Sequence, residues 1–164
     1  MLNGVVYKKT APAIVMTGIA FSLMTFPGIH VQAKTVSTTD TTVSTEQTQE
    51  AAALNAINAV RVQNGLQPLT LSTALAADAK IRAAECAVQL SHTRPNGSSW
   101  YTLDSANMYG ENLAADYTNA ADIVSAWMTS PVHRANLLRA EFTTCAMEEY
   151  QVGGRTFWAA EFGM

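Results

Sequence analysis

The chain has 164 residues, of which 48% are hydrophobic, and its formal net charge at pH 7 is −3. This composition supports a buried core, and the length suits a short leader followed by one domain of common size. The slightly acidic balance and the lack of a basic cluster exclude nucleic acid as an expected partner.

Residues 1–33 have the pattern of a secretory signal peptide. Lys8 and Lys9 give a positive start, residues 11–26 are apolar and uncharged, and small residues precede a cleavage point after Ala33. The alternative is a membrane anchor, but the apolar run of about 16 residues is shorter than the roughly 20 that span a bilayer. We therefore expect export, with no stable membrane span after cleavage.

Residues 34–49 are rich in Thr and Ser and contain no apolar side chain larger than valine. Such a segment buries too little surface to offset its ordering entropy, so it is predicted to be a flexible linker. One domain, residues 50–164, remains.

The first half of this domain is predicted to be helical. Apolar residues recur at helical spacing from Glu50 to Asn64, where Asn-Gly ends the helix. Ser72 or Thr73 can cap a second, alanine-rich helix that continues to about Leu90. Residues 91–99 then form a loop with a turn at residues 94–97.

Two further helices and a hairpin are predicted after this loop. Asn119 can cap a helix through Trp127, and Ser130-Pro131 has the pattern of an N-cap followed by the first helical residue. That start places His133 in the first turn of the next helix. The spacing of apolar residues then changes from the helical period to that of strands. It predicts two strands, residues 144–152 and 155–162, joined by Gly153-Gly154. Helices followed by an antiparallel sheet indicate an α+β domain.

The chain contains two cysteines, Cys86 and Cys145. In an exported protein they favour one disulfide, which would close a loop of about 60 residues and contribute about 4 kcal/mol in the chain-entropy model. The alternative is two free, buried thiols.

Four motifs in the domain together resemble the CAP superfamily. They are Ser-His-Thr-Arg-Pro-Asn-Gly at His92, Gly-Glu-Asn-Leu-Ala at Glu111, Ala-Trp-Met-Thr-Ser-Pro-Val-His-Arg-Ala-Asn-Leu-Leu at His133, and Phe-Trp-Ala-Ala-Glu-Phe-Gly at the C-terminus. This superfamily includes cysteine-rich secretory proteins, antigen 5 allergens and plant pathogenesis-related proteins. The chain is similar to its short bacterial branch, the SCP-like extracellular proteins, over about residues 52–164.

The resemblance implies an α-β-α sandwich, with a small antiparallel sheet between helical layers and a central cleft. His92, Glu111 and His133 match three of the four residues that line this cleft in the family. Counting from Trp127, Ser130 stands where many eukaryotic members carry the second glutamate. Glu161, in the final strand, is a candidate substitute acid.

The expected function is that of a secreted, non-enzymatic binding or interaction domain. The cleft residues His92, Glu111 and His133, with the loop aromatics Trp100 and Tyr109 as accessory candidates, suit a small polar or amphipathic ligand. The expected partner is an extracellular component of a cell wall, a lipid or a host surface. The protein is expected to be secreted, with loose association with the cell wall, and to require no cofactor.

The alternative function is a metal-assisted or acid/base hydrolase that uses the same cleft. His92 and His133 could hold a zinc ion together with Glu111 and a water, or Glu111 could act as a general base. However, the sequence has no nucleophile elbow and no pair of histidines spaced as ligands on one helix.

Overall fold

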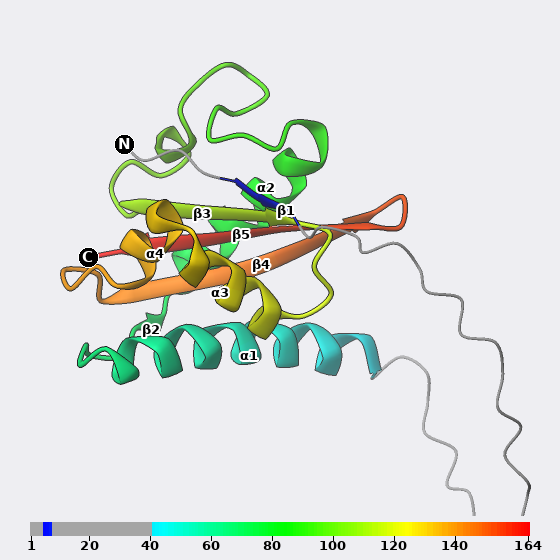
Figure 1. Ribbon diagram of the computed structural model, residues 1–164. Coiled ribbons are helices and arrows are strands. Elements are labelled where there is room, and N and C mark those ends of the chain that lie inside the picture. Colours follow the sequence, from blue (N-terminus) through cyan, green and yellow to red (C-terminus); the bar gives the residue numbers. More distant parts are fainter. Residues whose placement is uncertain (1–4, 8–40) are drawn as a thin grey trace, which may run out of the picture.

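A computed structural model describes residues 5–7 and 41–164 of the chain (Figure 1). Apart from Val5–Tyr7, the predicted signal peptide lies outside the described residues, as does the start of the predicted linker. Residues 41–49 of that linker are helical. The elements are β1 (Val5–Tyr7), α1 (Thr41–Gln63), β2 (Thr70–Leu71), α2 (Thr73–Val88), a 3₁₀ turn (Trp100–Thr102), β3 (Gly110–Ala115), α3 (Ala120–Thr129), α4 (Pro131–Leu137), β4 (Thr144–Val152) and β5 (Arg155–Gly163).

The strands form one sheet in the order β1-β3-β5-β4-β2. Its centre, β3, β5 and β4, is antiparallel, whereas the short edge strands β1 and β2 pair in parallel. The predicted hairpin is confirmed: Gly153 and Gly154 join β4 to β5 with φ of 59° and 74°. Positive φ at both central residues is what the tight hairpin turn requires, and glycine adopts it without strain.

The sheet is covered by helices on both sides, as Figure 1 shows. Alternate residues of the strands face opposite layers. One face packs against α2 through Leu113, Phe157 and Ala159, and the other packs against α1, α3 and α4 through Ala114 and Trp158. The predicted α+β sandwich is therefore confirmed, with a mixed rather than purely antiparallel sheet.

Two of the predicted helix starts are made by the expected side chains. Ser72 Oγ accepts a hydrogen bond from the Leu75 amide, and Asn119 Oδ1 accepts one from the Asp122 amide. These caps satisfy amides that lack a partner within the helix. Helix α4 also begins at Pro131, but the Ser130 side chain does not cap it.

Arg61 joins α1 to the segment between α4 and β4. It is 1% exposed, and its guanidinium donates hydrogen bonds of 2.9–3.1 Å to four backbone carbonyls. Without Arg61, the carbonyls of Gln67, Leu137 and Phe142 would need another donor, whereas that of Arg139 also accepts from the Phe142 amide. The acceptors belong to Gln67, Leu137, Arg139 and Phe142.

The predicted disulfide is wrong, because Cys86 and Cys145 are both free thiols. Cys86 lies on α2 and packs with the side chains on that face of the sheet. Cys145 lies on β4 and points to the opposite face, in the core beneath α1 and α3. The sheet separates the two sulfur atoms, so the alternative of two free, buried thiols is the correct one.

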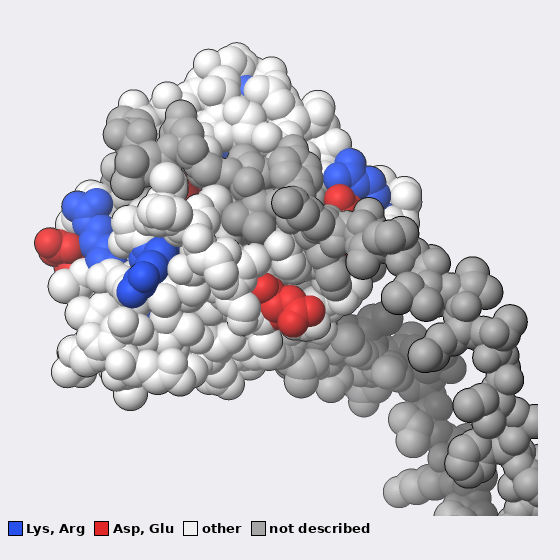
Figure 2. All heavy atoms as spheres, in the orientation of Figure 1, with Lys and Arg blue, Asp and Glu red and all other residues white. Residues whose placement is uncertain are grey.

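No helix among the described residues is long and apolar enough to cross a membrane. On the face shown in Figure 2, acidic and basic side chains are few and scattered, and the described part of this face has no continuous patch of one sign.

Candidate functional site

His92 and Glu111 lie in direct contact. The loop after α2 brings His92 to the start of β3, where Nδ1–H of its ring donates a hydrogen bond of 2.6 Å to Oε1 of Glu111. The Glu111 side chain faces α2 and is fully buried, whereas that of His92 is 10% exposed. An ionised carboxylate only accepts hydrogen bonds, so Nδ1 is the ring nitrogen that carries a proton in this contact.

Arg82, on the buried face of α2, supplies the charge that balances Glu111. Its Nε donates to Oε2 of Glu111 over 2.6 Å, and its Nη2 lies 3.3 Å from Oε1. Neither side chain of this ion pair is exposed. Nη2 also donates to the backbone carbonyl of Ser91, the residue before His92. Arg82 therefore holds both the carboxylate and the loop that carries the histidine.

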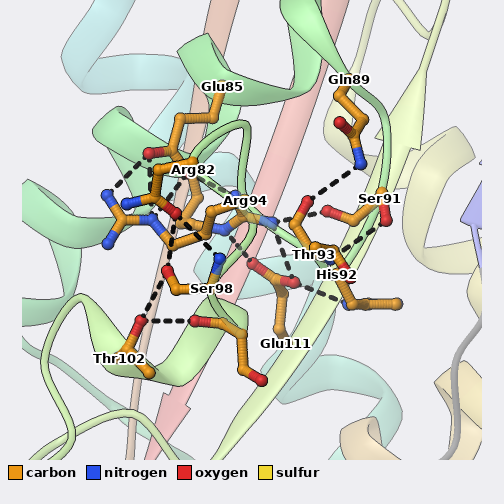
Figure 3. Close-up of polar contacts among 12 residues, drawn as sticks. Arg82, Glu85, Gln89, Ser91, His92, Thr93, Arg94, Ser98, Thr102 and Glu111 are labelled. Atoms are coloured by element: carbon orange, nitrogen blue, oxygen red, sulfur yellow. Dashed lines mark hydrogen bonds and ion pairs between the residues drawn. The ribbon is translucent and has the colours of Figure 1, made fainter.

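The network continues from Arg82 to the turn of the following loop (Figure 3). Glu85 accepts a 2.5 Å hydrogen bond from Arg82 and bonds of 2.7–3.1 Å from Arg94. Since Glu85 lies on α2 and Arg94 in the turn predicted at residues 94–97, this ion pair fastens the loop to the helix. The chain of contacts runs from Arg94 to His92 without a break.

The electrostatics of the network favour an ionised Glu111. Burial raises the pKa of this carboxyl, but the hydrogen bonds from His92 and Arg82 and the charge of Arg82 outweigh it, so the pKa falls below its ordinary value. Glu85 also has a lowered pKa, because its bonds to Arg94 and Arg82 outweigh its desolvation. Both acids carry charge at neutral pH.

His133 lies in the first turn of α4, as predicted, and is 2% exposed. A hydrogen bond of 2.9 Å joins its Nδ1 to Oγ of Ser130, and its ring stacks on Trp127 with 6.3 Å between centroids. The Asn112 amide donates to its backbone carbonyl. Asn112 follows Glu111 on β3, so its side chain points to the opposite face of the strand from that of Glu111.

Glu161 lies beside Glu111, since the two residues are paired across β3 and β5. Its side chain is completely buried. Burial, followed by the charge of Glu111, raises the pKa of Glu161 well above its ordinary value. The predicted accessory acid thus lies next to the histidine–glutamate contact, but it is not exposed to solvent.

The two predicted aromatic candidates, Trp100 and Tyr109, line one pocket. Tyr101 and Met108 complete its wall, and its volume is about 220 Å³. Tyr109 is 45% exposed. The pocket adjoins the network through the backbone, because the Trp100 amide donates to the carbonyl of His92.

The donor set does not fit a zinc site. Glu111 accepts hydrogen bonds on both oxygens, and its pairing with Arg82 leaves it no charge to offer a cation. Glu111 can therefore orient His92 but not bind a metal ion itself. The remaining candidate ligands are His92 and His133, fewer than the three protein ligands of catalytic zinc sites. Across residues 5–7 and 41–164, no group of three or more His, Cys, Asp or Glu side chains is arranged to hold a metal ion.

Arg82, Glu85 and Arg94 belong to the site but were not predicted from the sequence. Arg82 could have been found, because it stands seven residues after Leu75 and four before Cys86, on the apolar face of a helix. An arginine on a buried face needs either an acidic partner or several backbone carbonyls, as Arg61 has. Nothing in the sequence says that the partner is Glu111.

Comparisons with known proteins agree with this fold. A family model described as "Cysteine-rich secretory protein family" (CAP) matches residues 54–162. The uncharacterized protein YkwD of Bacillus subtilis is 28% identical over 109 residues, which cover 62% of this chain and 42% of that protein. The chain therefore matches less than half the length of this curated relative.

Two solved structures share the fold at low sequence identity. An extracellular SCP-domain protein from Bacillus anthracis superposes with a TM-score of 0.65 at 21% identity, over 79% of this chain and 45% of that one. A cysteine-rich secretory protein from Staphylococcus aureus superposes with a TM-score of 0.57 at 17% identity, over 74% and 40%. At these identities the likeness shows the fold alone.

Proposed function

This chain belongs to the cysteine-rich secretory protein (CAP) family, and we propose that it is an exported, non-enzymatic binding domain for a cell-wall component. The observation that carries the proposal is the pocket of Trp100, Tyr101, Met108 and Tyr109, which adjoins the His92 loop. Aromatic rings with polar edges suit an amphipathic ligand. A volume of about 220 Å³ suits one ring-sized group of a larger ligand rather than a whole molecule.

The network behind the pocket supports a fixed site. Arg82 holds the Ser91 carbonyl at the start of the loop, and Arg94 fastens the turn of the loop to Glu85. A loop held at two points needs less ordering when a ligand binds, which favours affinity.

The same contacts disfavour the hydrolase alternative. A general base needs a carboxylate oxygen that can reach the substrate and a pKa close to the working pH. Glu111 has both oxygens occupied and a pKa that its partners lower. We therefore propose binding without turnover.

Export is part of the proposal. The leader pattern of residues 1–33 supports it, and the matched structures are described as extracellular or, in Borrelia burgdorferi, as an outer surface protein. Expression of the full chain in a Gram-positive bacterium tests it. We expect the protein in the medium or the wall fraction with Lys34 at its N-terminus, and retention in the cytoplasm would contradict it.

Co-sedimentation with insoluble peptidoglycan tests the ligand. We expect the exported protein to pellet with peptidoglycan and a Tyr109→Ala variant to bind at least fivefold more weakly. Tyr150→Ala is the matched control, because Tyr150 is an exposed tyrosine on β4 outside the pocket. Equal binding by both variants, or binding only to phosphatidylglycerol vesicles, would contradict a cell-wall ligand in this pocket. Release of soluble fragments from the peptidoglycan would support the hydrolase instead.

A further inference from the structure

Glu161 is an acid buried without a hydrogen-bond donor. It lies near the end of β5 with 0% exposure, on the face of the sheet that packs against α2. Neither of its carboxyl oxygens has a hydrogen-bond partner among the described residues. An ionised carboxylate in such a place is strongly disfavoured relative to the neutral acid.

The nearest acid is Glu111, directly across the pair of strands. Directly opposite residues of an antiparallel pair have Cβ atoms about 4.5–5.5 Å apart on the same face of the sheet, so the two carboxyl groups are neighbours. Two ionised carboxylates only accept hydrogen bonds, so a bond between them requires that one of them carry a proton. Like charges at such a distance also prevent both groups from ionising together.

Arg82, the cation on this face, makes no hydrogen bond to Glu161, although its positive charge partly offsets the rise in the pKa of Glu161. Arg82 directs Nε to Glu111, Nη1 to Glu85 and Nη2 to the Ser91 carbonyl and Glu111. These bonds fix which of the paired acids is ionised, because the guanidinium and the His92 ring both donate to Glu111.

The other titratable groups on the elements around Glu161 give it no positive charge. One oxygen of Asp78, a turn before Arg82 on α2, is also buried without a partner. Asp104 lies close enough to Asp78 to raise its pKa, after the larger effect of burial. The remaining groups are two thiols and one acid: Cys86 on α2, Cys145 on β4, and Glu148, buried on the same face of β4.

We infer that Glu161 is protonated in the folded domain and donates a hydrogen bond to the Glu111 carboxylate, so that the buried pair holds one proton. The directions of the two pKa shifts agree with this assignment. Burial and the neighbouring charge raise the pKa of Glu161, whereas the donors around Glu111 lower its pKa. A pair of carboxyls driven apart in this way is one acid and one base.

Because of this proton, the free energy of unfolding should decrease as the pH rises into the alkaline range. The pKa of Glu161 is higher in the folded chain than in the unfolded chain, so its contribution is fully present below the ordinary glutamate pKa. It is lost as the pH rises toward the folded pKa. Ionisation would place a second negative charge beside Glu111, the acid that orients His92.

A Glu161→Gln variant tests the inference by equilibrium denaturation between pH 5 and 9. The amide N–H can donate to Glu111 as the protonated acid does, so we expect the variant to fold. In the wild type, the unfolding equilibrium constant should rise by up to about tenfold per pH unit from this one proton. The variant should lack that component, whereas Glu149→Gln, on the neighbouring strand β4 and partly exposed, should keep the wild-type dependence.

Infrared spectroscopy of the wild type provides a readout that needs no variant to fold. We expect a carbonyl stretch from a protonated carboxylic acid at pH 7, which shifts in heavy water and is missing from Glu161→Gln. Absence of this band from the folded wild type would overturn the inference. An identical pH dependence in the wild type and Glu161→Gln would also overturn it.

Discussion

Cys86 and Cys145 lie on opposite faces of one β-sheet, each in a separate part of the core. A disulfide requires Cα atoms within about 7 Å and converging Cβ atoms. Strand β4 directs Cys145 away from α2, so the bond could not form without disrupting the sheet. The domain depends on packing rather than on a covalent crosslink.

We predict that both thiols are free but unreactive in the folded protein. Burial raises the pKa of Cys86 to about 12 and that of Cys145 further still, and the reactive species is the thiolate. Labelling with a thiol reagent at pH 8 should be slow in buffer and should reach two groups per chain in denaturant without reductant. A Cys86→Ala variant should then give one group. A melting temperature that falls on adding reductant would show a disulfide instead.

Loss of the Glu111 charge should be costly for folding. In Glu111→Gln the buried Arg82 guanidinium loses its fully buried counter-charge, so we expect a loss of about 3–5 kcal/mol in the free energy of unfolding. Urea denaturation measures it. Glu141→Gln is the control, because Glu141 pairs with Arg139 at 3.4 Å on the surface, and its loss should cost at most about 0.5 kcal/mol. Equal effects of the two substitutions would contradict a buried ion pair.

The same acid should govern stability at low pH. Because the folded pKa of Glu111 is lowered, its contribution is present above the ordinary glutamate pKa near 4.5 and is lost as the pH falls through the folded value. We therefore expect the wild type to lose stability steeply below about pH 4.5. Acid denaturation followed by circular dichroism should show a shallower dependence for Glu111→Gln. Parallel curves would mean that other carboxyls control this transition.

Local sequence signals predicted most of the secondary structure. Ser72, Asn119, Pro131 and the Gly153-Gly154 turn each act through their own backbone or within three residues, so a short pattern is enough to identify them. Helix α1 differs from its prediction, since it begins at Thr41, inside the predicted linker, and the strands β1 and β3 were not predicted.

The site was only partly predictable, because its decisive contacts join distant segments. The family motifs mark His92 and Glu111, and the structure does place these two in contact. Arg82 is 29 residues from Glu111, and its partner is set by where α2 lies on the sheet. The cysteines were misjudged for the same reason, since the face to which Cys145 points depends on the strand register.

Gly110 is a second case in which tertiary structure explains a motif residue. A Cβ built at this position would lie 2.7 Å from the ring of Phe142, closer than real contacts allow. The glycine that precedes Glu111 is therefore needed for close packing against the segment before β4. The sequence alone indicates a close approach but not the residue approached.

Arg61 should be as important for stability as the residues of the site. Its guanidinium is the donor to four carbonyls that link α1 to the segment before β4, and a buried acceptor without a donor costs about 1–3 kcal/mol. We expect Arg61→Met, which keeps the length of the side chain, to lower the free energy of unfolding by about 3 kcal/mol or more. Arg134→Met on the exposed side of α4 is the matched control and should change it by at most about 0.5 kcal/mol. Chemical denaturation of both variants measures the difference. Arg61 lies across the sheet from Glu111, so the losses in free energy of unfolding from Arg61→Met and Glu111→Gln should add in the double variant. Strong coupling between the two substitutions would contradict independent contributions.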